Sequence, residues 1–278
     1  MRSTDKGMEM GSEFEDKVVW ITGGGTGIGR ALALEFGGCG AVVAVSGRRR
    51  EPLDEAVEAI EEAGGRGLAV CCDVTKVTDI ENAVDEIVSE TGRLDVAVAN
   101  AGFSVAGPFE ELSASDWKRQ FDVNVVGLAM TVQVALPHLR QTNGRIALMG
   151  SVAGTVGLPK NGPYSASKAA VRSIGQTLTA ELVDTGVSCT TLLPGFVESD
   201  IGKVDNKGEY QADWEDRRPK KLMWPADKAA KKMYGAIKRR RMEAVITGHG
   251  KVVAFFGDHT PRLMQTLVGR FGQNAREK

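Results

Sequence analysis

The strongest constraint on the fold is a glycine-rich turn that stands between a short apolar run and a helical pattern. Residues 17–22 read Lys-Val-Val-Trp-Ile-Thr, a run typical of a buried parallel strand. Residues 23–29 read Gly-Gly-Gly-Thr-Gly-Ile-Gly, and a helical pattern follows over 30–36. Glycines allow a backbone to approach a pyrophosphate, and a helix N-terminus offers free N–H groups to it. We therefore predict that the chain contains a dinucleotide-binding unit.

Strand-like and helix-like segments alternate along the rest of the chain. Further strands are expected at 41–46, 67–72, 94–99, 144–149, 187–193 and 244–247. Helices are expected between them, at 51–63, 77–91, 113–138, 164–185 and 225–242. This alternation predicts an α/β fold with a doubly wound parallel sheet, Rossmann-like and of about seven strands, with helices on both faces.

The chain divides into three predicted parts. Residues 1–15 are polar, and we expect a flexible leader or tag there. Residues 16–250 form the predicted Rossmann-fold catalytic domain, in which the charged, irregular segment 196–224 is the substrate loop. Residues 251–278 form an amphipathic C-terminal extension that we expect to pack on the body or on another subunit. A peripheral membrane contact through 251–271 is the alternative.

Composition narrows the function classes. A net charge of −1 gives no support for nucleic-acid binding. The three histidines are widely spaced and the four cysteines lack a C-x-x-C pattern, so no metal site is expected. The N-terminus is polar, and no apolar stretch approaches the ~18 residues that span a bilayer. We expect a cytoplasmic protein.

A second constraint is the segment from Ser151 to Lys168. Tyr164 and Lys168 are four residues apart, so they share one face of the helix expected from residue 164. A phenol has an ordinary pKa of about 10, and a nearby ammonium favours the phenolate, so we expect Lys168 to lower the pKa of Tyr164. If Ser151 ends the preceding strand, its hydroxyl reaches the same space. A tyrosine with a lysine one turn later is also common on protein surfaces, so the other motifs must decide.

The end of the second expected strand bears on the cofactor. Many NAD sites place an acid there to hold the ribose 2′-OH, but here Gly47 is followed by Arg48 and Arg49. An arginine at this place can pair with a 2′-phosphate through its fork of donors. NADP(H) is therefore favoured, with NAD(H) as the alternative. The bland interpretation is that these arginines begin a solvated helix.

Seven motifs occur in one order along the chain: Thr22-Gly-x-x-x-Gly-x-Gly29, Asp73-Val74, Asn100-Ala-Gly102, Asn124, Ser151, Tyr164-x-x-x-Lys168 and Pro194-Gly195. In this order they resemble the short-chain dehydrogenase/reductase family, in its shorter single-domain form, over roughly residues 16–250. Two positions depart from the family pattern. Ala99 stands where a second asparagine is frequent, and Ser199 replaces a frequent threonine while keeping the hydroxyl.

The resemblance implies a role for each of four catalytic residues. Tyr164 would be the acid in ketone reduction and the base in alcohol oxidation. Lys168 would lower its pKa and bind the nicotinamide ribose, and Ser151 would donate a hydrogen bond to the substrate oxygen. Asn124 would hold a water that links Lys168 to solvent.

The motifs and the arginine argument together predict the binding residues. Cofactor contacts are expected at Gly23, Gly25, Thr26, Gly27, Ile28, Gly29, Arg48, Arg49, Asp73, Val74, Asn100, Ala101, Gly102, Tyr164, Lys168, Pro194, Gly195, Val197 and Ser199. Substrate contacts are expected at Ser104, Ser151, Val152, Tyr164 and Phe196.

The predicted function is hydride transfer between a nicotinamide cofactor and a small-molecule ketone or secondary alcohol. One alternative is a catalytically inactive dinucleotide sensor or scaffold, which would normally lose the tyrosine or the lysine. Another is an epimerase or dehydratase of the same broad family, which usually carries T-G-x-x-G-x-x-G and a larger C-terminal domain. The resemblance also implies a homodimer or homotetramer that pairs the long helices after Ser113 and Tyr164.

Overall fold

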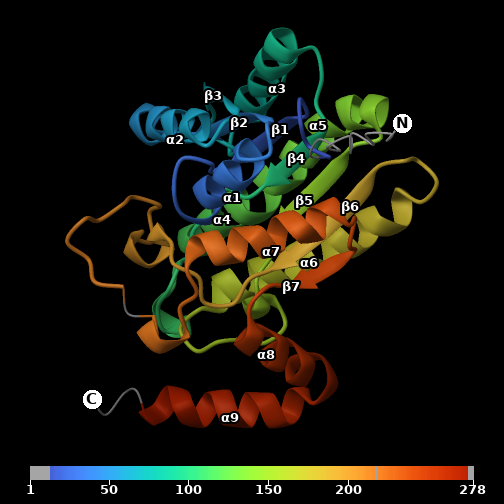
Figure 1. The fold of residues 1–278 in the computed structure, drawn as a ribbon. Helices are drawn as coiled ribbons and strands as arrows, with labels where there is room; N and C mark the ends of the chain where they lie inside the picture. The colour runs from blue at the N-terminus through green and yellow to red at the C-terminus, as the bar shows by residue number, and fades with distance from the viewer. Residues whose placement is uncertain (1–12, 217, 275–278) are drawn as a thin grey trace, which may run out of the picture.

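A single parallel sheet organises the protein (Figure 1). The computed structural model describes residues 13–216 and 218–274. Within them the strands follow the order β3-β2-β1-β4-β5-β6-β7, all parallel. Their bounds are β1 Val18–Thr22, β2 Val42–Gly47, β3 Arg66–Cys71, β4 Val96–Ala99, β5 Arg145–Met149, β6 Ser188–Leu193 and β7 Glu243–Val245. The predicted fold class is confirmed. From β1 the chain adds β2 and β3 on one side of the sheet, and it then crosses over to add β4 to β7 on the other side. Ligands bind beyond the carboxyl ends of the strands at such a switch point.

Helices cover both faces of the sheet and enclose two apolar layers. One layer lies under α1 Gly27–Gly37, α2 Arg50–Glu62 and α7 Ala226–Lys238. The other lies under α3 Val77–Thr91, α5 Leu128–Thr142 and α6 Gly162–Glu181. The central strand β1 is buried along its whole length, which explains why its sequence is a continuous apolar run rather than an alternating one.

The helix expected over 113–138 is interrupted. Ser113 does form the expected capping box with Asp116 at the start of α4 Ala114–Phe121. A π-helical segment then follows at Asp122–Gly127 before α5 begins. The wider turn inserts an extra residue into the helical ladder, and such segments are frequent at functional sites. Here the segment carries the fully buried Asn124.

The predicted leader is wrong at its last residues. Phe14 is fully buried, and its ring meets those of Phe36 and Tyr234 edge-on, with centroids 5.0 and 5.3 Å away. The Arg145 guanidinium lies 5.0 Å from the centre of the Phe14 ring. A single apolar side chain among polar residues gives no periodic signal, although it contributes to the core under α1 and α7. Residues 1–12 lie outside the described residues.

The chain beyond β7 forms two helices, α8 Gly248–His259 and α9 Pro261–Asn274. Arg172 of α6 pairs with Glu243 at 2.7 Å and with Asp258 of α8 at 2.7 Å. The expected domain limit at residue 250 therefore falls inside a helix that is bound to the body. Figure 1 shows α9, in red, lying beyond α8 and away from the sheet, and its Leu263 and Leu267 are exposed.

Candidate active site

The glycine turn lies at the carboxyl end of β1, as the sequence predicts. Gly23 and Gly27 have φ of +64° and +53°, a region that favours glycine. A methyl group on Gly29 would collide with the main-chain oxygen of Gly23 and the amide of Asn100. Gly27 begins α1, so the free N–H groups of this helix face the turn. The turn therefore has the close approach and the open helix end that a pyrophosphate needs.

Asn100 fixes the turn to the neighbouring strand. Its Nδ2 donates to the main-chain oxygens of Thr22 at 2.8 Å and Gly23 at 3.1 Å. The Thr22 hydroxyl accepts the N–H groups of Asn100 at 3.0 Å and Ala101 at 3.1 Å. Two strand ends are thereby held together on the floor of the predicted cofactor site. Thr22 is the first residue of the glycine motif, but the motif alone did not indicate that its hydroxyl holds the neighbouring strand end.

A cleft of about 760 Å³ opens beside this floor. Predicted cofactor residues that line it are Gly23, Gly25, Thr26, Arg48, Arg49, Asp73, Val74, Ala101 and Gly102. Arg119, Lys207 and Tyr210 also line it, although none of them belongs to a motif. The Asp73 carboxylate accepts from the main-chain N–H and hydroxyl of Thr75, at 3.0 and 2.8 Å. Cationic side chains line the cleft, but the four predicted catalytic residues do not.

Ser151, Tyr164 and Lys168 meet where β5 is followed by α6. Ser151 comes two residues after the end of β5 and its hydroxyl accepts the N–H of Ala153 at 3.1 Å. Tyr164 lies in the first turn of α6, and Lys168 follows one turn later with its Nζ 5.8 Å from the centre of the Tyr164 ring. The predicted juxtaposition of three side chains is thus present in the structure.

Lys168 is 4% exposed and donates from Nζ to the main-chain oxygen of Met149 at 2.7 Å. Burial lowers its pKa to about 8, because desolvation penalises the charged ammonium. If residue 102 carried a Cβ atom, that atom would lie 3.6 Å from Nζ of Lys168 and 3.1 Å from Oδ1 of Asn124. Glycine at 102 therefore lets two predicted catalytic groups approach the cofactor floor.

The expectation that Lys168 lowers the pKa of Tyr164 is wrong, because the pKa of Tyr164 is raised. Burial raises the pKa of the phenol, and the Ser151 hydroxyl and the charge of Arg218 only partly oppose that rise. Tyr164 keeps some accessible surface, yet its ring lies deep among protein atoms, so desolvation prevails. The groups that oppose the rise are Ser151 and Arg218, while the Lys168 ammonium donates to the Met149 oxygen.

Asn124 binds the segment that follows Gly102. Its Oδ1 accepts the N–H of Phe103 at 3.1 Å, and its Nδ2 donates to the Phe103 oxygen at 3.1 Å and to Ser167 at 3.2 Å. Ser167 in turn donates to the main-chain oxygen of Tyr164 at 2.7 Å. The amide is therefore committed to positioning two site segments, and its predicted role in holding a water stays a prediction.

The segment after β6 closes the other side of the site. The Pro194 oxygen accepts the N–H of Val152 at 3.0 Å. Gly195 has no room for a side chain, because Thr247 and His249 stand against it. Val152 is buried, whereas Phe196 keeps accessible surface and stacks on the His249 ring with centroids 5.7 Å apart.

Two residues without any sequence motif hold this segment. The Nη groups of Arg218 donate to the main-chain oxygens of Val197 at 3.0 Å and Ser199 at 2.7 Å. His249 Nε2 accepts the N–H of Phe196 at 3.0 Å. Arg218 lies in the irregular segment and His249 just before the predicted extension, where neither periodicity nor motif points to a site.

Metal-binding clusters and membrane-spanning helices are both absent from the described residues. Within residues 13–216 and 218–274, no cluster of three or more His, Cys, Asp or Glu side chains could hold a metal ion. Over the same residues, no helix combines the length and apolar character needed to cross a bilayer. Ser104, predicted to contact substrate, is half-buried next to Phe103.

Comparison with known proteins identifies the family. The family model described as short chain dehydrogenase matches residues 17–209. A hydroxynaphthalene reductase of Aspergillus fumigatus is 36% identical over 195 residues, which cover 70% of this chain and 71% of that protein. The 11-beta-hydroxysteroid dehydrogenase 1A of Arabidopsis thaliana is 39% identical over 196 residues, which cover 70% of this chain and 55% of that protein. The chain thus spans about half the length of that plant relative.

Among solved structures, a short chain dehydrogenase/reductase from Burkholderia phymatum in complex with NAD has a TM-score of 0.82 at 28% identity. The match covers 90% of this chain and 96% of that one. The chain belongs to the short-chain dehydrogenase/reductase family. It is an oxidoreductase with a nucleotide-binding Rossmann-like fold.

Proposed function

We propose that the protein transfers hydride between NADP(H) and a ketone or secondary alcohol, with Tyr164 as general acid and base. The observation that carries this proposal is the position of Tyr164 beside Ser151 and one helical turn before Lys168. A proton donor, a hydrogen-bond donor and a cation gather there beside the floor formed by the glycine turn. Ketone reduction is helped by a positioned proton donor and by groups that stabilise the negative charge developing on the substrate oxygen.

The residues at the cleft suit a dinucleotide. The pyrophosphate would lie against Gly23 to Gly29, where positive φ and missing side chains leave room and the α1 N-terminus offers N–H groups. The adenosine would lie near Asp73 and Val74. The remaining proposed contacts are Asn100, Ala101, Gly102, Lys168, Pro194, Gly195, Val197 and Ser199. The bound cofactor supplies the hydride, and the protein supplies orientation and proton transfer.

We favour NADP(H) over NAD(H) because Arg48 and Arg49 line the cleft after β2. Their guanidinium groups would pair with a 2′-phosphate, and no acid of the β2 end stands in their place. The solved relative that is in complex with NAD leaves this preference to experiment.

The protonated form of Tyr164 suits its proposed role as the acid in ketone reduction. Because the pKa of Tyr164 is raised, the phenol is protonated at neutral pH and is ready to donate to the substrate oxygen. Ser151 would donate a hydrogen bond to the same oxygen as negative charge develops on it. Lys168 would bind the nicotinamide ribose.

The proposal is tested with Tyr164→Phe. We expect turnover of a ketone panel to be lost while NADPH binding, followed by fluorescence titration, is retained. Tyr234→Phe, a tyrosine that packs on the α1 side away from the site, is the matched control and should turn over normally. The panel should include hydroxynaphthalene- and hydroxysteroid-related ketones, since two relatives carry those names. Wild-type turnover in Tyr164→Phe contradicts the proposed mechanism.

We also propose a homo-oligomer and a cytoplasmic location. Val126 of the π-helical segment is 50% exposed on the helices expected to pair, so Val126→Glu should lower the molar mass measured by light scattering. An unchanged mass would argue against pairing at this face.

The cytoplasmic location is supported by the four cysteines, which are all free thiols, as suits a reducing compartment. Localisation of a tagged full chain would test this location.

A further inference from the structure

The tip of the irregular segment between β6 and α7 is a hairpin, residues 203–211. The N–H of Asp205 donates to the Glu209 oxygen at 2.9 Å, and that of Gly208 donates to the Asp205 oxygen at 3.0 Å. The Asp205 carboxylate accepts the N–H groups of Lys207 at 2.8 Å and Glu209 at 2.9 Å. Desolvation acts to raise the pKa of Asp205, but these N–H groups hold it below its ordinary value. The hairpin is therefore organised by its own hydrogen bonds.

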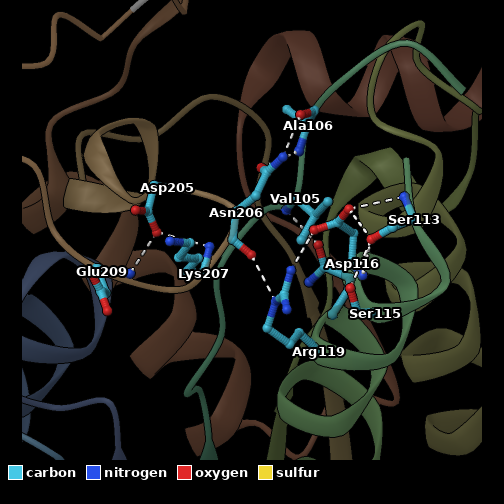
Figure 2. Close-up of polar contacts among 11 residues, drawn as sticks. Val105, Ala106, Ser113, Ser115, Asp116, Arg119, Asp205, Asn206, Lys207 and Glu209 are labelled. Carbon is cyan, nitrogen blue, oxygen red and sulfur yellow. Dashed lines mark hydrogen bonds and ion pairs between the residues drawn. The ribbon is translucent and has the colours of Figure 1, made fainter. Parts of the chain in front are cut away.

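Asn206 attaches this hairpin to the body of the protein (Figure 2). Its Oδ1 accepts the N–H of Ala106 at 3.0 Å and its Nδ2 donates to the Ala106 oxygen at 2.9 Å. The amide thus pairs with both polar groups of one residue, as a neighbouring strand would. The main-chain oxygen of Asn206 accepts from Nε of Arg119 at 3.1 Å, and Arg119 is held by Asp116 at 2.5 Å. Figure 2 shows Asn206 between Ala106 and Arg119.

The surface that receives Asn206 is fixed from inside the protein. The N–H of Val105 donates to Oε1 of Gln120 at 2.6 Å, and Nε2 of Gln120 donates to the Phe103 oxygen at 2.8 Å. Asn124 binds both polar groups of Phe103. Gln120 and Asn124 are fully buried. Ala106 therefore follows a segment whose position is set by two buried amides.

The hairpin also contacts the residue that we expect to read the cofactor. Nη2 of Arg48 donates to the Gly208 oxygen at 2.6 Å. Five residues of the hairpin line the cleft: Val204, Lys207, Gly208, Glu209 and Tyr210. A guanidinium has five N–H donors, so the bond to Gly208 leaves others for a phosphate. The hairpin thus forms a wall at the Arg48 end of the cleft, which Tyr164 does not line.

We propose that Asn206 is a positioning residue that keeps the hairpin closed over the Arg48 end of the cofactor cleft. The identity of the ligand rests on the proposed function. With the hairpin in place, the Arg48 guanidinium that donates to Gly208 would also pair with the 2′-phosphate, so the hairpin would retain NADP(H) more strongly than NAD(H). Release of the nucleotide then requires that the bonds between Asn206 and Ala106 break.

The attachment itself is tested on the full chain without nucleotide, by hydrogen exchange. In Asn206→Ala, the amide of Ala106 and those of the hairpin should exchange about tenfold faster, because two hydrogen bonds are lost. Gln211→Ala is the matched control: its amide donates to Asp205 inside the hairpin at 3.0 Å and does not contact Ala106. The Ala106 amide should keep its wild-type rate there. An unchanged rate at Ala106 in Asn206→Ala overturns the proposal.

The consequence for the cofactor is tested by stopped-flow release of NADPH and NADH. We expect Asn206→Ala to release NADPH about tenfold faster than the wild type, with a smaller change for NADH. Equal NADPH release from Asn206→Ala and wild type overturns the proposal. If neither nucleotide binds the wild-type protein, the proposed function fails instead, and the exchange experiment still decides the role of Asn206.

Discussion

Arg218 donates to the main-chain oxygen of Ser199 at 2.7 Å, from a segment that joins β6 to α7. It also donates to the Val197 oxygen, and its own charge is balanced by Asp216, whose Oδ2 lies 2.7 Å away. Burial raises the pKa of Tyr164, and the charge of the same guanidinium partly opposes that rise. One side chain therefore links the segment proposed to hold the nicotinamide with the proposed acid.

We predict that Arg218→Gln separates these two effects. A positive charge favours the phenolate, so its removal should raise the pKa of Tyr164 and move the rising limb of alcohol oxidation to higher pH. The KM for the cofactor should also rise, because Val197 and Ser199 lose their donor. Arg218→Lys keeps the charge but not the fork, so it should raise KM and leave the pH limb in place. An oxidation profile in Arg218→Gln identical to the wild type would refute the electrostatic link.

Arg48→Ala should reduce the preference for NADPH over NADH by about tenfold to a hundredfold, the range expected when a charge-assisted hydrogen bond is lost. The reason is that its guanidinium lines the cleft and has N–H donors free for a 2′-phosphate. Steady-state kinetics with both nucleotides measure the ratio. Arg66→Ala, an exposed arginine at the start of β3, is the matched control. A wild-type protein that prefers NADH would remove the basis of the cofactor assignment.

The lowered pKa of Lys168 predicts a pH dependence for reduction. The ammonium is charged below about 8 and neutral above it, so kcat/KM with NADPH should be flat at neutral pH and fall as pH rises through about 8. The Tyr164 limb lies higher because the pKa of the phenol is raised. Lys168→Arg stays charged over this range, so whatever activity it retains should lack that limb. Persistence of the same limb in Lys168→Arg would assign it to another group.

Phe14→Ala should destabilise the protein by about 3–5 kcal/mol, the usual cost of removing a buried aromatic ring. Phe14 is fully buried between Phe36 and Tyr234. Urea denaturation followed by circular dichroism measures the change. Phe109→Ala removes a ring that is 75% exposed and should change the stability by less than about 0.5 kcal/mol. Equal stability of Phe14→Ala and wild type would mean that residue 14 adds nothing to the core.

Some of the architecture could be predicted because it is written in local patterns. The β1 run, the glycine turn and the Tyr164–Lys168 spacing each concern neighbours in the sequence, so their geometry follows from a strand end or a helix turn. Arg218 and His249 act on residues 19 and 53 positions away, and no pattern along the chain encodes such contacts. The π-helical turn at Asn124 could not be predicted from the sequence either, because the extra residue changes the hydrogen-bond ladder of the helix and leaves the composition of the segment helical. The sign of the Tyr164 shift depends on burial, which only the fold determines.

The two ion pairs of Arg172, with Glu243 and Asp258, have a mechanical consequence. Arg172 stands one turn after Lys168 on α6 and pairs with Glu243 of β7 and Asp258 of α8, so α8 is tied to the helix that carries Tyr164. A tether at the C-terminus, on a sensor surface or in a fusion, would transmit its load along α9 to Asp258, at the end of α8, and from there through Arg172 to α6. Immobilisation by that end would therefore load the helix that carries Tyr164.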